Sequence, residues 1–297
     1  MSLLWNSEQR PREERQEAGI VCLFTGTGSI RLRGLRAGNK IGGATFGLVE
    51  TREKIRAACN LVNERYLWRG YGGNHRLLLD AYHATFTAEV GGEVVGTITL
   101  ATDSRNGLAA DRTFQEGLDR YRAQPGAKLC ELTKFAFNSS IRSQEMMAAL
   151  FHIVFVYGHR SYGCTDLFIE VNPRHARFYE AMLGFERVGP VRENESVHAP
   201  AQLMWLKVAS IREQINAVAG KAPIVNQRSL YRLFFSPAEE DRIYERLVAA
   251  KTVAAISDQQ AIGLAAHSGQ PTPKVHPRNA EQTQRSGPTV AESLCYA

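Results

Sequence analysis

The stretch CELTKFAFNSSIRSQEMM, from Cys130 to Met147, places a carboxylate and a lysine in an apolar run and then opens a helical pattern. Alternation of side chains predicts a strand with Lys134 on the face opposite to Glu131. The face of Glu131 is otherwise mainly apolar and holds Leu129, Thr133, Phe135 and Phe137. Burial among such residues raises the pKa of a carboxyl towards the range of a general base at neutral pH.

Two interpretations of Glu131 follow from this position. The functional one is a base that takes a proton from an attacking amine, directly or through one water. The structural one is an ion pair with Lys134 or with a nearby arginine. Strand alternation disfavours a pair with Lys134, since the two side chains are predicted on opposite faces.

Composition excludes several classes of protein. The chain has 297 residues, 44% of them hydrophobic and 22% charged, which is typical of a globular protein with one sizeable core. The net charge of +6 is dispersed, so no nucleic-acid partner is expected, although an acidic partner would suit it. Five cysteines without CxxC spacing, and an N-terminus without a signal-peptide pattern, predict a cytoplasmic protein with reduced thiols. The run MMAALFHIVFVYG is too short to cross a bilayer, so no transmembrane segment is expected, and peripheral membrane contact stays open.

Changes in composition along the chain predict its organisation. The start is charged and then rich in glycine, and the end is polar without periodicity, which is typical of disorder. The predicted parts are a flexible N-terminal arm (1–43), a core domain (44–208), C-terminal helices (209–255) and a disordered tail (256–297).

The core domain shows an order of elements that predicts a mixed α/β (α+β) fold. An amphipathic helix after Thr51 ends near Trp68, and two β-rich runs joined by Gly91 and Gly92 predict a hairpin. The strand of Glu131, a central helix over 142–161, and two further strands around a short helix complete it. This order predicts a mostly antiparallel central sheet flanked by helices.

Four segments carry a resemblance to known families. NPRHARFYEAMLGFERVG (172–189) resembles the closing motif of the GNAT acyltransferase superfamily. Three others, NERYLWRGYG (63–72), GTITLATDSRNGLAADRTFQ (96–115) and ELTKFAF (131–137), resemble N-acyl amino acid synthases and, more distantly, acyl-homoserine-lactone synthases. The resemblance spans roughly residues 44–208. It implies a GNAT-like fold and transfer of a long acyl chain from acyl carrier protein (ACP) to an amino acid, within lipid biosynthesis. An acyl-phosphopantetheine thioester would be the donor substrate, with no other cofactor.

The resemblance also implies a role for Tyr179. In the GNAT pattern the tyrosine of Phe-Tyr lies near the departing sulfur and can donate a proton to the thiolate. The alternative is plain packing, since aromatic residues in a short helix are usually core and a thiol leaving group needs little help.

The segment SSIRSQEMM (139–147) bears on the donor. GNAT enzymes that use CoA usually carry a glycine-rich loop here, whose amides hold the pyrophosphate at a helix N-terminus. This chain lacks those glycines, which disfavours CoA, and keeps Arg142, which with a few amides suits the single phosphate of a phosphopantetheine arm. Alternatively, Arg142 is a solvated residue of the first helical turn.

An amino acid acceptor needs a cation for its carboxylate. Arg65, Arg69 and Lys134 are the candidates, and a planar guanidinium favours one of the arginines without deciding between them. Either arginine could instead bind the carrier. The sequence leaves open the acceptor, the acyl chain length and the oligomeric state.

Other chemistries fit less well. The His75/His83 and His152/His159 pairs lack a third ligand at a supporting spacing, so no metal site is expected. Three alternative functions stay open. They are an acyl-CoA-dependent GNAT N-acyltransferase, an acyl-homoserine-lactone synthase, for which no S-adenosylmethionine site is identified, and a non-catalytic module that binds an acyl group or a carrier.

Overall fold

The fold is built on a nine-stranded sheet in the computed structural model, which describes residues 21–24, 29–37, 40–72, 74–78, 80–139, 143–219 and 229–249. The strand order is β1-β2-β3-β4-β5-β6-β7-β9-β8, and every described pairing is antiparallel except that of β6 with β7. The strands are β1 (Val21–Phe24), β2 (Ser29–Ala37), β3 (Lys40–Leu48), β4 (His83–Val90), β5 (Glu93–Thr102), β6 (Leu129–Phe137), β7 (Asp166–Val171), β8 (Glu186–Asn194) and β9 (Ala199–Lys207). This confirms the predicted mixed α/β, mostly antiparallel fold.

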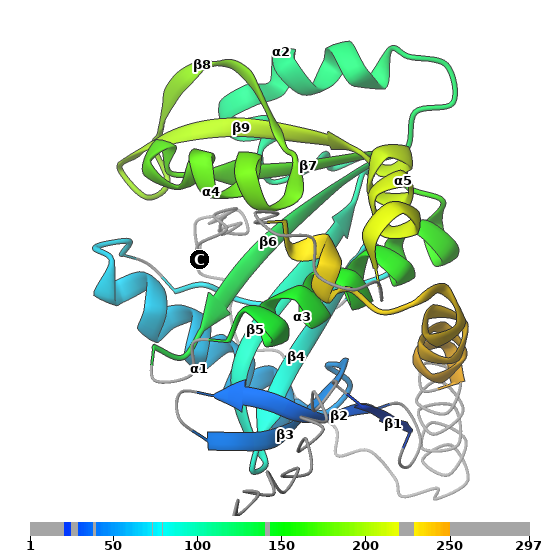
Figure 1. Cartoon of the computed structure of the whole chain (residues 1–297). Coiled ribbons are helices and arrows are strands. Elements are labelled where there is room, and N and C mark those ends of the chain that lie inside the picture. Colours follow the sequence, from blue (N-terminus) through cyan, green and yellow to red (C-terminus); the bar gives the residue numbers. More distant parts are fainter. Residues whose placement is uncertain are drawn as a thin grey trace, which may run out of the picture.

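Helices cover both faces of the sheet (Figure 1). One face packs against α1 and α2, and the other packs against α3, α4, α5 and the helical turn η2. The bounds are α1 (Arg52–Trp68), α2 (Asp111–Arg122), α3 (Gln144–Tyr157), α4 (Pro173–Leu183), α5 (Val208–Val218) and η2 (Leu230–Leu233). A π-helical turn, η1 (Gly158–Tyr162), extends α3, and residues 237–249 form a last helix.

Local sequence signals explain several of these boundaries. The side chain of Thr51 caps α1 by accepting a hydrogen bond from the Lys54 amide at 3.3 Å. Gly91 and Gly92 join β4 to β5 with φ values of 62° and 88°, which confirms the predicted hairpin turn.

The N-terminal segment differs from its prediction. A flexible arm was expected over residues 1–43, but β2 and β3 pair with each other, and β3 continues onto β4. Ile30 and Leu32 are fully buried in the main core. The alternation of apolar residues in SIRLRGL is a strand signal that the surrounding glycines obscured. The first 20 residues and the predicted tail (256–297) lie outside the described residues.

Strands β6 and β7 form a fork. They pair in parallel at only three positions, the last being Glu131 with Phe168, although β6 continues to Phe137 and β7 to Val171. In Figure 1 the two strands run together at their start and then diverge, opening towards α4 and the end of α1. Glu131 therefore lies where the two strands begin to separate.

A β-bulge in β6 corrects the predicted strand faces. Thr99 of β5 pairs with Thr133, but Thr97 pairs with Ala136, so β6 has one more residue than β5 in this interval. Lys134 takes the left-handed φ of 54°, which is uncommon for a residue other than glycine.

The bulge changes which residues share a face with Glu131. Lys134, predicted opposite, lines a cavity together with Thr133 on the side of Glu131. Phe135 and Phe137, predicted beside Glu131, instead belong to the core on the α3 side. Strict alternation failed because one inserted residue inverts the order of all later side chains.

The C-terminal helices dock through a buried polar cluster. His152 of α3 is fully buried, and the amide of Phe235 donates a hydrogen bond to its Nδ1 at 2.9 Å. Its Nε2 lies 2.8 Å from Glu240, which also accepts from Arg212 of α5 at 2.6 Å. In the described part of the chain, no helix is both long and apolar enough to cross a membrane.

Candidate active site

Glu131 lies at the fork with its side chain fully buried. Its carboxylate accepts a hydrogen bond from the Ala110 amide at 3.2 Å, just before the first residue of α2. A helix start presents unpaired N–H groups and a partial positive charge, which favour the ionised form of a nearby carboxyl.

Burial nevertheless dominates the ionisation of this group. It raises the pKa of Glu131 from 4.5 to about 8, and the negative charges of Glu170 and Asp111 act in the same direction. Hydrogen bonds from the backbone of Ala110 and Ala109 oppose the rise. A carboxyl with a pKa near neutrality exchanges protons readily under physiological conditions, which is the property that a general base requires.

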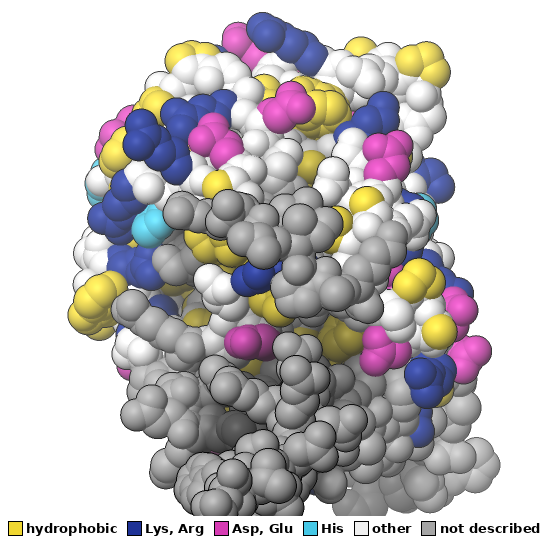
Figure 2. Space-filling model, viewed as in Figure 1, with side chains coloured by type: hydrophobic (Ala, Val, Ile, Leu, Met, Phe, Trp, Pro, Cys, Tyr) yellow, Lys and Arg dark blue, Asp and Glu magenta, His cyan; other side chains and the backbone are white. Residues whose placement is uncertain are grey.

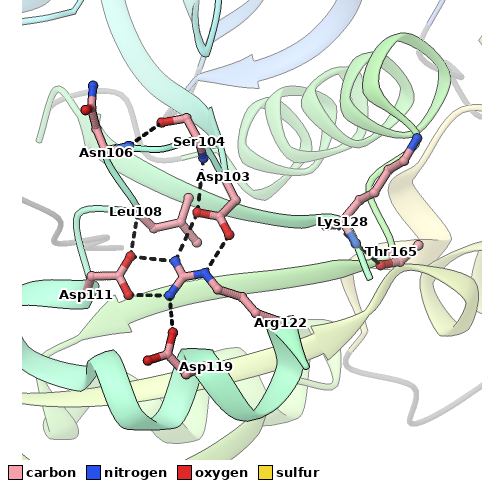
Figure 3. A network of polar contacts seen from close by, with 9 residues as sticks. All are labelled: Asp103, Ser104, Asn106, Leu108, Asp111, Asp119, Arg122, Lys128 and Thr165. Carbon is pink, nitrogen blue, oxygen red and sulfur yellow. Dashed lines mark hydrogen bonds and ion pairs between the residues drawn. The ribbon is translucent and has the colours of Figure 1, made fainter. Parts of the chain in front are cut away.

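An arginine network fixes the loop that carries these amides (Figure 3). Arg122 donates to Asp103 and to Asp111 at 2.6 Å each, and to Asp119 at 2.8 Å. Asp111 also accepts from the Leu108 amide at 2.6 Å. The network thus ties the end of β5 to both ends of α2 and holds in place the loop whose amides contact Glu131.

A polar cavity opens beside Glu131. Its volume is about 450 Å³, close to the 470 Å³ of a second cavity further along β6. Its floor includes Ala101, Ala109, Thr133 and Lys134, which surround Glu131 on β5, β6 and the loop before α2. Arg76 and Arg112 also line it. We call it the polar cavity; its lining holds three cationic side chains, those of Lys134, Arg76 and Arg112.

A second cavity, the fork cavity, lies further along β6. It is bounded by the end of β6, the start of α3, α4 and the end of α1. Its lining includes the apolar side chains of Phe135, Phe137, Met147 and Phe178 and the polar side chains of Arg65, Arg69, Ser143 and His175. Consecutive residues of β6 therefore face two different cavities, with the bulge at Lys134 between them.

The candidate carboxylate-binding residues are divided between these cavities. Lys134 lies in the polar cavity, whereas Arg65 and Arg69 line the fork cavity. Arg69 lies 3.4 Å from His175 of α4. Burial, followed by the charges of Arg69 and Arg174, lowers the pKa of His175 to about 4, so this imidazole is neutral at pH 7.

The end of α1 exposes apolar surface beside the fork cavity. Trp68 is 70% exposed and Leu67 is 72% exposed. The guanidinium groups of Arg65 and Arg69 lie 5.0 Å and 5.9 Å from the Trp68 ring. Figure 2 shows Lys and Arg side chains along the left side of the molecule, over α4 and the end of α1.

Tyr179 and Arg142 are the other two candidate site residues from the sequence. Tyr179 is fully buried and packs edge-on against Phe178 and Phe185, so the packing contacts of the alternative interpretation are present. Its role as a proton donor stays a prediction. Arg142 lies outside the described residues, but Ser143 caps α3 beside the fork cavity by accepting from the Met146 amide at 3.2 Å.

Sequence reasoning missed Glu170, a second carboxyl at the fork. It is fully buried, and burial raises its pKa to about 8. The signal was present, because Glu170 interrupts the apolar strand DLFIEV as Glu131 interrupts its own strand. Among the described residues, no group of three or more His, Cys, Asp or Glu side chains could hold a metal ion.

Comparison with known proteins defines the family. Residues 57–207 match the family described as N-acyl amino acid synthase FeeM. The chain belongs to this family. The matched region contains β6, the fork and both cavities, and membership makes the chain an N-acyltransferase.

The solved structure of FeeM agrees with this assignment. FeeM, an N-acyl amino acid synthase from uncultured soil microbes, is 27% identical, with a TM-score of 0.54, and the match covers 58% of this chain and 95% of FeeM. The acyl-homoserine-lactone synthase LasI is 16% identical, with a TM-score of 0.42, and the match covers 56% of this chain and 89% of LasI. An acyl-CoA N-acyltransferase from Pseudomonas aeruginosa is 15% identical, with a TM-score of 0.41, over 54% and 97% of the two chains. No curated protein matches the chain.

The raised pKa of Glu131 predicts how stability depends on pH. Below about pH 4.5 the folded and unfolded chains both hold this proton, so its contribution to stability is fully present. Between pH 4.5 and about 8 only the folded chain retains the proton, so stability falls with rising pH by up to about 1.4 kcal/mol per unit. Urea unfolding at pH 5, 6, 7 and 8 should show a shallower fall for Glu131→Gln than for wild type. Equal slopes would contradict the raised pKa.

Proposed function

We propose that this N-acyltransferase moves a long acyl chain from the phosphopantetheine thioester of ACP to the amino group of an amino acid. In this proposal the fork cavity holds the donor arm, the polar cavity holds the acceptor, and Glu131 takes the amine proton. The observation that carries it is a fully buried carboxyl on the strand whose consecutive residues Lys134 and Phe135 line two different cavities, one on each side of the bulge.

The donor arm suits the fork cavity for two reasons. Phe135, Phe137 and Phe178 provide apolar surface for the arm and for the start of an acyl chain. The first turn of α3, capped by Ser143, and the guanidinium of Arg65 supply donors and positive charge for its phosphate.

The exposed end of α1 supports a protein-borne donor. ACP is acidic, and the exposed Trp68 with two arginines near its ring offers it positive charge and apolar contact beside the fork cavity. In this proposal Arg65 and Arg69 bind the carrier and its arm. Carrier binding was the alternative that the sequence left open beside binding of the acceptor carboxylate.

The acceptor carboxylate suits Lys134. The bulge brings this ammonium group to the same side as Glu131, and Arg76 and Arg112 add positive charge to the polar cavity. An amino acid bound through its carboxylate would place its amine, two bonds away, within the region between Lys134 and Glu131. This assignment replaces the preference for an arginine that the sequence alone favoured.

The chemistry requires two protons to leave the amine. Glu131 accepts one from the ammonium form, and the freed nitrogen lone pair attacks the thioester carbon. The C–S bond breaks as the tetrahedral intermediate collapses, and the second proton is transferred to the departing thiolate. Amide and holo-ACP thiol are the products, and the proton on Glu131 returns to solvent. The Ala110 amide, in the loop before α2, holds the Glu131 carboxylate in place during these steps.

The first prediction for this function concerns Glu131→Gln, which keeps the shape of the side chain and loses the base. Turnover should fall by about 10²-fold or more while the fold survives. Formation of N-acyl amino acid, followed by mass spectrometry with acyl-ACP as donor, measures it. The matched control is Glu116→Gln, an exposed position on α2 that should retain wild-type turnover. Turnover of Glu131→Gln close to wild type would return Glu131 to a structural role.

A second prediction concerns the donor. The same long acyl chain is presented on ACP and on CoA at matched concentrations, and ACP should give the higher kcat/KM. Added salt should slow the ACP reaction more, since attraction between exposed charges is screened over about 8 Å at physiological ionic strength. Arg65→Glu should weaken use of acyl-ACP, whereas Arg120→Glu, exposed on α2, should not. Equal use of both donors with equal salt dependence would favour an acyl-CoA enzyme instead.

A third prediction concerns Lys134→Met, which retains length and loses the charge. The KM for the amino acid should rise about tenfold or more with little change in kcat, because a charge-assisted hydrogen bond contributes about 1.5–3 kcal/mol. Lys128→Met, exposed at the start of β6, is the control. An unchanged KM would remove Lys134 from the acceptor site.

A further inference from the structure

Glu170 and Glu131 lie on the same face of the sheet at the fork. Glu131 pairs with Phe168 in the parallel register, so the two side chains point to the same side. Glu170 follows Phe168 by two residues and shares its face. The carboxyls are therefore diagonal neighbours across β6 and β7, and both are fully buried.

The two oxygens of Glu170 have different environments. Oε1 accepts from the side-chain amide of Asn194 on β8 at 2.5 Å. The orientation of that amide is fixed, because Asn194 Oδ1 accepts from the Ser196 amide at 2.9 Å. Oε2 is buried and has no hydrogen-bond partner in the described part of the chain. Buried polar atoms without a partner are rare in folded proteins and often mark a functional group or a proton position.

Glu131, in contrast to Oε2 of Glu170, has a backbone hydrogen-bond donor. Its carboxylate accepts from the Ala110 amide at the start of α2, and this favours its ionised form. Two acidic groups act on it, Glu170 of β7 and Asp111 of α2. The neutral amide of Asn194 faces Glu170. Two buried carboxyls this close cannot both ionise easily, so they release their protons in two coupled steps.

We propose that Glu170 is a positioning residue that shares a proton with Glu131. In the working state Glu170 is protonated on Oε2 and donates that proton in a hydrogen bond towards the carboxylate of Glu131. The arrangement favours the ionised form of Glu131, which is the form that accepts a proton from the amine, without placing two negative charges at the fork. The proposal rests on the proposed function, in which Glu131 is the base.

The matched variant is Glu170→Gln, which retains an oxygen for Asn194 and replaces the shared O–H···O⁻ bond with a weaker N–H···O⁻ bond. The midpoint of the rise of kcat/KM with pH should move up by about one pH unit, which makes the variant about tenfold slower below the midpoint and close to wild type above it. Glu116→Gln is the control and should keep the wild-type profile.

Each other outcome overturns the proposal. A midpoint that moves down would show that Glu170 is ionised and repels the charge on Glu131. An unchanged midpoint, with or without loss of stability, would show that Glu170 has only a structural role.

Carboxyl ¹³C NMR of glutamate-labelled protein tests the pair independently of activity. Wild type should show two coupled carboxyl titrations. Each signal is assigned by its loss in Glu131→Gln or in Glu170→Gln. In Glu170→Gln the remaining Glu131 signal should titrate at a higher pH than the first wild-type step. Two independent titrations near the ordinary pKa of 4.5 would overturn the proposal even if Glu170→Gln did not fold. If wild type forms no N-acyl product from any donor, the proposed function fails, while this titration still decides whether the proton is shared.

Discussion

One extra residue in β6 is the constraint on which the site depends. The bulge at Lys134 inverts the alternation of side chains, so that Thr133 and Lys134 face the polar cavity and Phe135 and Phe137 turn into the core and the fork cavity. Bulges re-aim side chains next to active sites in many sheets. Without it, the lysine would lie on the α3 side and would not share a face with Glu131.

The fork supplies a second constraint, which is electrostatic. A carboxyl without water at the point where β6 and β7 separate needs donors, and the loop before α2 provides them through Ala110. The Arg122 network holds that loop by bridging three aspartates. Burying charged and polar groups in this way rarely adds stability, and such concentrations of groups with shifted pKa values are typical of functional sites.

The proposed catalysis and the proposed carrier recognition use different parts of the molecule. The proposed chemistry belongs to buried groups between the sheet and α2, whereas the proposed carrier contacts lie on the exposed end of α1, where Arg65 and Arg69 lie near the Trp68 ring. This separation lets the outer surface change partner preference while the buried carboxyls stay in place. Fold alone does not decide the donor, because the same architecture serves many acyl groups.

The sequence by itself determined the mixed sheet, the hairpin at Gly91 and Gly92, the helix caps and the burial of Glu131, because each of these is encoded by neighbouring residues. Sequence reasoning put Lys134 on the wrong face of its strand, took the N-terminal strands for a flexible arm, and overlooked Glu170. Only tertiary structure decided these, since a bulge is defined by the partner strand, the N-terminal strands need a sheet to join, and two carboxyls 39 positions apart become a pair only when β6 and β7 align.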